Sequence, residues 1–292
     1  SGLNLNVDDE VDMSFDYGSF LFSGEFDMDD EVLISDKLEW EVEGWSVDGD
    51  DEVDFTMEDL NFSFTGELDT RREILDADEL TMEASGVELS AGDGDMSGED
   101  IDFSFSGEFN ERDGQMAITF MEFEMTEVEI LGEGEKLGFG EFSFNWDNGD
   151  ETIRIYDDSF DNPDALMDID YMNIDLDMKD FQLPEGLTSE FDMDDLGISE
   201  IEGGSASLSI LKDDEKFTFK SETSSAIGDF EIEMESNNIS DRDPNIELYI
   251  LLDDVEDILE SLGINENKLE FEYDGKSSEL QIAFMEYMGE LF

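Results

Sequence analysis

The 292-residue sequence contains no cysteine and no histidine. Disulfides, thiolate metal sites and redox motifs are therefore excluded. Ser-His-Asp and Cys-His nucleophile systems are excluded too, as are zinc sites built on imidazole. No Gly-rich phosphate loop with its lysine occurs. No run of about 18 apolar residues exists, so the sequence predicts no membrane-spanning helix.

Basic residues are also scarce: 13 lysines and arginines stand against 86 aspartates and glutamates, a formal net charge of -73. Binding to a nucleic acid backbone needs basic contacts, so we expect no nucleic-acid partner. Repulsion on this scale destabilises a compact state at low salt. High salt, bound divalent cations or an acidic medium would relieve it. Halophilic adaptation is the simplest account of this composition.

Disordered acidic segments are poor in aromatic residues, but this chain has 24 phenylalanines and 15 methionines. We therefore expect a packed core. The chain begins with Ser1-Gly2 rather than with methionine, which favours a processed mature form or a trimmed chain. We expect an extracytoplasmic location, meaning secreted, cell-surface or periplasmic.

Apolar and polar residues alternate along most of the chain. Leu38, Trp40 and Val42, for example, alternate with Glu39 and Glu41. This period of two indicates strands with one apolar face and one face of carboxylates and hydroxyls. The sequence therefore predicts an all-β fold of antiparallel, repeat-built sheets. They would form an elongated sandwich or an open β-groove.

An internal repeat supports this prediction. Its three copies, 42 and then 41 residues apart, are Phe20-Leu21-Phe22-Ser23-Gly24-Glu25-Phe26, Phe62-Ser63-Phe64-Thr65-Gly66-Glu67-Leu68 and Phe103-Ser104-Phe105-Ser106-Gly107-Glu108-Phe109. Between copies, Gly44 and Gly86 interrupt the apolar alternation and predict a bulge or bend. We predict a β-repeat half over residues 1–157 and a second β-rich half over 158–292, or one continuous domain.

Turn residues separate the predicted strands. Asn148-Gly149 predicts a hairpin between 142–146 and 153–155, and Asp274-Gly275 predicts another between 269–273 and 280–284. Asp213-Asp214 predicts a turn between 208–210 and 217–219. One short helix near the C-terminus is predicted at about 253–262, where Val255, Ile258, Leu259 and Leu262 form an apolar stripe.

Calcium is the cofactor that this composition supports, because closely spaced carboxylates can supply its six to eight oxygen ligands. Asp93, Asp95, Ser97 and Glu99 are the first candidate ligands. This stretch resembles the opening of the EF-hand-type Asp-x-Asp-x-Ser-Gly loop, although Ser104 stands where that loop has its bidentate glutamate. Asp48, Asp50 and Glu52, beside Asp51, form a second candidate cluster. Asp192, Asp194 and Asp195 form a third. No zinc, haem, nucleotide or redox cofactor is expected.

Three functions fit these observations. The first is a non-catalytic, acidic extracytoplasmic structural or surface protein that salt or divalent cations stabilise and that assembles with itself through edge strands. The second is lipid binding in a Phe-rich groove. The alternating strands over residues 10–240 resemble the β-repeat regions of AsmA-like envelope proteins, which implies lipid transport and outer-membrane assembly.

The third function is carbohydrate binding or a carboxylate-based glycosidase. Paired carboxylates arise by accident in so acidic a chain, and three tryptophans and six tyrosines are few for stacking on sugars. We therefore expect a protein that is not an enzyme.

Overall fold

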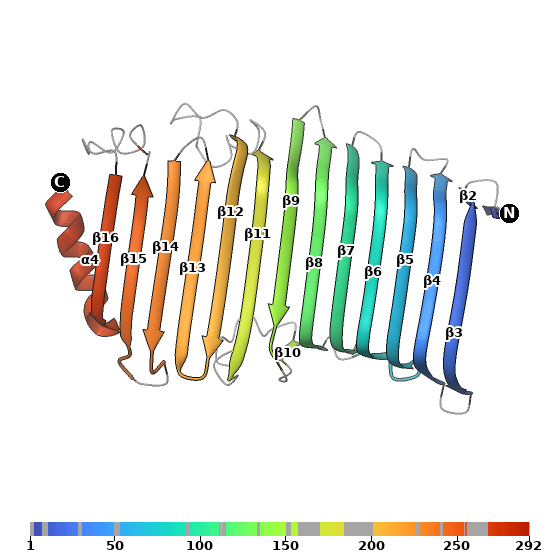
Figure 1. Cartoon of the computed structure of the whole chain (residues 1–292), viewed down its shortest axis with the longest axis horizontal. Coiled ribbons are helices and arrows are strands. Elements are labelled where there is room, and N and C mark those ends of the chain that lie inside the picture. The colour runs from blue at the N-terminus through green and yellow to red at the C-terminus, as the bar shows by residue number, and fades with distance from the viewer. Residues whose placement is uncertain are drawn as a thin grey trace. The chain divides into compact units, whose positions relative to one another are not determined.

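The computed structural model describes residues 3–7, 11–28, 31–49, 53–91, 94–110, 112, 115–132, 135–149, 153–156, 170–183, 201–225, 228–239, 242–253, 255 and 268–291. Within them it contains sixteen strands and one helix (Figure 1). The elements are β1 (Leu3–Val7), β2 (Val11–Phe15), β3 (Tyr17–Asp27), β4 (Val32–Gly49), β5 (Val53–Asp69), β6 (Ile74–Ala91), β7 (Gly94–Asn110), β8 (Gln115–Gly132), β9 (Glu135–Asp147), β10 (Ile153–Tyr156), β11 (Tyr171–Leu183), β12 (Ile201–Asp213), β13 (Lys216–Ser225), β14 (Gly228–Asn237), β15 (Asn245–Asp253), β16 (Lys268–Lys276) and α4 (Ser277–Leu291).

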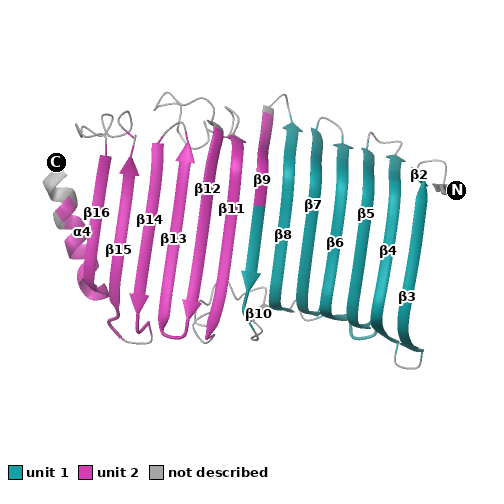
Figure 2. Ribbon diagram, in the orientation of Figure 1, with its two compact units in different colours: residues 1–134, 143–169 teal, residues 135–142, 170–292 magenta. Residues whose placement is uncertain are grey.

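The chain divides into two compact units (Figure 2). Unit 1 comprises residues 1–134 and 143–169, and unit 2 comprises residues 135–142 and 170–292. Strand β9 contributes residues to both units. The predicted boundary between halves 1–157 and 158–292 falls on residues outside the described ones, so it stays a prediction.

Unit 1 is an open antiparallel sheet whose strands β4 to β8 follow the chain order. Strands β2 and β3 both pair with β4, at its two ends, and β1 pairs with β2. All described strands of unit 1 belong to the same sheet, so no second sheet faces them there. The predicted all-β, antiparallel, repeat-built fold is confirmed.

The strand register gathers the apolar residues of unit 1 into continuous rows, because directly opposite residues share a face. Each opposite pair contributes about 0.2–1 kcal/mol. The three central rows are Phe22, Leu38, Phe64, Leu80, Phe105 and Met121, then Phe20, Trp40, Phe62, Met82, Phe103 and Phe123, then Val42, Leu60, Ala84, Ile101 and Met125.

The repeat is visible in the backbone. At Gly24, Gly66 and Gly107 the register shifts by one residue, with the extra residue on the neighbouring strand. A Cβ at any of the three would lie 2.0–2.1 Å from a carbonyl oxygen of that strand. Only glycine fits so close an approach, which explains why the motif keeps it.

A second irregularity recurs at Gly44, Gly86 and Glu127, again 42 and 41 residues apart. All three have left-handed φ values, 64°, 58° and 48°. The opposing strand pairing is interrupted there without a change of register. The bend predicted at Gly44 and Gly86 is therefore confirmed.

Unit 2 contains the antiparallel strands β11 to β16, which pair in chain order. The turn predicted at Asp213-Asp214 is confirmed, since Asp213 pairs with Lys216 and Asp214 has a φ of 51°. The helix predicted over 253–262 falls mostly outside the described residues. Of that segment, Asp253 ends β15 and Val255 is not helical.

The helix that the structure describes in unit 2 is α4, which follows β16 directly. The Asp243 carboxylate accepts hydrogen bonds from the Ser278 amide and the Ser277 hydroxyl, both at 3.0 Å. These bonds satisfy orphan donors of the first helical turn, and the Ser278 amide is the main reason that the pKa of Asp243 is lowered. The predicted short helix near the C-terminus is confirmed in kind, at a later position than expected.

The hairpin predicted at Asp274-Gly275 is wrong. Both residues lie within β16, and segment 280–284, predicted as a strand, belongs to α4. Phe284 and Tyr287 pack on Phe271, with ring centroids 5.3 and 5.1 Å away. A helix brings both rings to the same side, which a strand would not.

The hairpin predicted at Asn148-Gly149 is also wrong, because β10 pairs with residues 115–118 of β8 rather than with β9. Asn148 is fully buried and explains the difference. Its side chain accepts a hydrogen bond from Trp146 Nε1 at 2.7 Å and donates one to the Ile118 carbonyl at 2.8 Å. Its amide donates to the Thr119 carbonyl at 3.1 Å. These bonds hold the chain against β8.

Candidate functional site

The apolar face of unit 1 is the main candidate site. We call its three central rows, together with Trp45, Met57 and Phe55 beyond the Gly44 bend, the apolar trough. The middle of the trough is buried, with Val42 4%, Leu60 7% and Phe64 5% exposed. Towards the β3 side it opens, because Phe20 is 67% exposed and Trp40 is 41% exposed. Large aromatic surface is thus left in contact with solvent.

The left-handed conformation at Gly44 keeps the apolar side chains on one face of the strands. Trp40 and Trp45 are five residues apart, about 16 Å along a straight strand, and would point to opposite faces. Their ring centroids instead lie 6.3 Å apart. Buried residues from both sides of the bend, Val42 and Met57, belong to one packed cluster. The apolar trough therefore continues on one face across Gly44.

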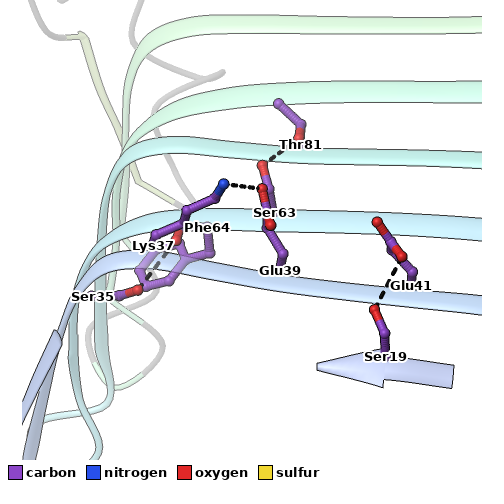
Figure 3. Close-up of polar contacts among 8 residues, drawn as sticks. All are labelled: Ser19, Ser35, Lys37, Glu39, Glu41, Ser63, Phe64 and Thr81. Carbon is purple, nitrogen blue, oxygen red and sulfur yellow. Dashed lines mark hydrogen bonds and ion pairs between the residues drawn. The ribbon is translucent and has the colours of Figure 1, made fainter. Parts of the chain in front are cut away.

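A second change of direction occurs at the glycine bulges. Figure 3 shows the strand ribbons turning beside Ser35 and Phe64, where the Ser35 hydroxyl donates a hydrogen bond to the Phe64 carbonyl at 3.2 Å. Bulges bend strands and increase their twist. The central rows of the apolar trough lie between these bulges and the Gly44 bend.

The opposite face of unit 1 carries hydroxyls and carboxylates. Ser19 donates to Glu41 at 3.0 Å, and the hydroxyls of Ser63 and Thr81 lie 2.7 Å apart (Figure 3). Burial raises the pKa of Asp102, and the neighbouring Glu83 and Asp100 raise it further. Like charges therefore interact across this face, which we call the acidic face.

The structure describes only some of the predicted calcium ligands. Asp93, Asp50 and Glu52 lie outside the described residues, as does the 192–195 cluster. Asp95, Ser97 and Glu99 follow one another along β7. Glu99 occupies the repeat position of Asp16 and Glu58, whose side chains lie over Gly44 and Gly86.

One group of three carboxylates converges among the described residues, and it lies in unit 2. Oxygens of Glu222, Glu231 and Glu233 come within 4.8 Å of one another, whereas Asp48, Asp95 and Glu99 join no such group in the described part of the chain. The calcium sites stay predictions.

The ammonium group of Lys220 already sits among these three carboxylates. Its Nζ lies 2.5 Å from Glu222, 2.9 Å from Glu233 and 3.9 Å from Glu231. The hydrogen bonds to Glu222 and Glu233 raise the pKa of Lys220 far above its usual range. Because all four side chains are 29–49% exposed, each pair stabilises the fold by at most about 1 kcal/mol. Sequence reasoning missed this cluster, since its members join only through the β13–β14 register.

Part of the apolar surface of unit 2 is covered. Helix α4 covers Phe271, and Val255, 1% exposed, packs against Phe230, Leu252 and Leu269. No helix among the described residues is long and apolar enough to cross a membrane. Comparisons with protein-family models, curated proteins and solved structures found no match.

Proposed function

We propose that this chain binds lipid acyl chains, without catalysis, in the apolar trough of unit 1. The exposed aromatic surface of the trough carries this proposal, because Phe20 is 67% and Trp40 is 41% exposed. Contiguous exposed apolar surface on a soluble protein marks an interaction site. Among the described strands of unit 1, no second sheet covers the trough as the partner in a sandwich would.

The side chains of the trough suit such a ligand. Phenylalanine and methionine dominate the central rows, and methionine adapts to irregular apolar shapes. No lysine or arginine belongs to these rows, so an anionic headgroup finds no partner there. With a net charge of -73 the chain should prefer zwitterionic headgroups.

A binding titration tests the proposal. The probe is a fluorescent lysophosphatidylcholine below its critical micelle concentration, added to the whole chain. The Phe20→Glu variant places a charge in the trough, and we expect about tenfold weaker binding, equivalent to about 1.4 kcal/mol. Tyr17→Glu is the matched control, because Tyr17 lies on the same strand but opposite Glu43 on the acidic face.

Two results would remove the proposal: no saturable binding by the wild-type chain, or equal losses in both variants. Circular dichroism melts of each variant show whether the sheet is intact.

The acidic face favours a second candidate function, that of an extracytoplasmic structural protein stabilised by cations. The raised pKa of Asp102 beside Glu83 and Asp100 supports it, because bound cations would relieve this repulsion. Calcium titration by calorimetry tests it, and the absence of any calcium-dependent heat would remove it.

A further inference from the structure

Strand β3 forms an edge of the unit 1 sheet and differs from its repeat counterparts. Strands β5 and β7 carry the same motif, and each is hydrogen-bonded on both sides. Among the described residues, β3 pairs with β4 alone. The β3 edge therefore offers the backbone groups that β5 and β7 use for a second partner.

The β3 edge is also unusually apolar. Phe20, Leu21, Phe22 and Phe26 on this strand are 67%, 50%, 37% and 51% exposed. Residues 17–24 contain no charged side chain in a chain where 34% of residues are charged. Soluble proteins usually protect an edge with lysine, proline or an inward charge. Neither lysine nor proline occurs on β3.

We propose that two copies of this chain pair through their β3 strands, antiparallel, about a two-fold axis at Phe22. In this register Phe22 lies opposite its own counterpart, Phe20 opposite Gly24, and Phe26 opposite Gly18. Residues of equal parity meet, so both apolar faces lie on the same side of the extended sheet. The interface is isologous and closes at two copies.

The charges and the shape of the edge fit this register. Glu25 lies opposite Ser19 and Asp27 opposite Tyr17, so no carboxylate faces another directly. A phenylalanine opposite a glycine already occurs in unit 2, where the Phe181 ring covers Gly204. In the described part of the chain, β1 pairs with residues 11–15 and not with β3. This pairing does not depend on lipid binding.

Cysteine cross-linking tests the register, because the chain has no cysteine of its own. Opposite residues of antiparallel strands have Cα atoms about 4.5–5.5 Å apart, which a disulfide spans. Phe22→Cys should give a disulfide-linked dimer under mild oxidation. Phe20→Cys is the matched control, since its two copies would lie about 13 Å apart. Equal cross-linking of both variants, or none of Phe22→Cys, would overturn the proposal.

Light scattering tests the pairing without cross-linking. At about 1 M sodium chloride the Debye length is about 3 Å, so repulsion between the two copies is screened. We expect the wild-type chain under these conditions to have twice the 33.1 kDa mass of one copy. Leu21→Lys should be monomeric because a lysine on an edge strand opposes pairing with another chain, whereas Val53→Lys, at a residue that is 43% exposed on β5, should leave the dimer intact. A wild-type monomer, or the same mass for both variants, would contradict the pairing.

Discussion

The glycine of the repeat motif offers the sharpest test of the bulged sheet. A Cβ at Gly66 would lie 2.1 Å from the Asp76 carbonyl oxygen and 3.0 Å from the Ala77 Cα. Both contacts are to backbone, so neither can move as a flexible side chain would. The φ of 145° adds strain for any residue with a Cβ. Overpacking and backbone strain each cost about 1–3 kcal/mol, and we expect Gly66→Ala to destabilise the fold by about 3 kcal/mol.

Thermal melts followed by circular dichroism measure this cost. At roughly 2–4 °C per kcal/mol, the melting temperature should fall by roughly 6–12 °C. Gly132→Ala is the matched control, because no atom lies within 4 Å of its Cβ position, and it should change stability by less than about 0.5 kcal/mol. If Gly66→Ala has the same melting temperature as Gly132→Ala, β5 and β6 do not approach each other as described.

Three further predictions concern the bend and the acidic face. Glu127→Gly should stabilise the fold by about 1 kcal/mol, because Glu127 holds the left-handed conformation of Gly44. The control Glu124→Gly, without that conformation, should destabilise it, and a loss of stability for Glu127→Gly in urea melts would contradict the repeat. Asp102→Asn should raise the melting temperature by about 1 °C at neutral pH. Folding raises the Asp102 pKa, so the ionised carboxylate destabilises the fold above the folded-state pKa, and this destabilisation fades as the pH falls through that pKa. A rise in the melting temperature of Asp102→Asn that grows on acidification would refute this. Melting temperature should climb with sodium chloride and faster with calcium at equal ionic strength, and a melt insensitive to both would show that the repulsion is negligible.

Alternation and repeat spacing predicted most of this fold, because a period of two identifies strands whichever partners they take. Other features depended on contacts between distant residues. Strand β10 joins β8 through the buried hydrogen bonds of Asn148 to Ile118, which no local pattern reveals. Segment 280–284 carries apolar residues at a spacing that suits a strand or a helix, and its contacts with Phe271 decide the outcome.

The candidate site was predicted only in part. A Phe-rich apolar face followed from the alternation, but its continuity across residue 44 depends on the left-handed bend. Gly44 and Gly86 marked two of the three bends, whereas the third has Glu127, a residue type that gives no such signal. That equivalence became visible only when the backbone conformations were compared.

The proximity of Trp40 and Trp45 permits a direct test of the central claim that the apolar trough holds acyl chains. The measurement is tryptophan emission during titration with lysophosphatidylcholine, brominated and unbrominated on its acyl chain. We predict saturable quenching by the brominated lipid alone, most of which Trp40→Phe should remove. Equal emission with both lipids, or quenching that survives Trp40→Phe unchanged, would show that acyl chains do not enter the trough.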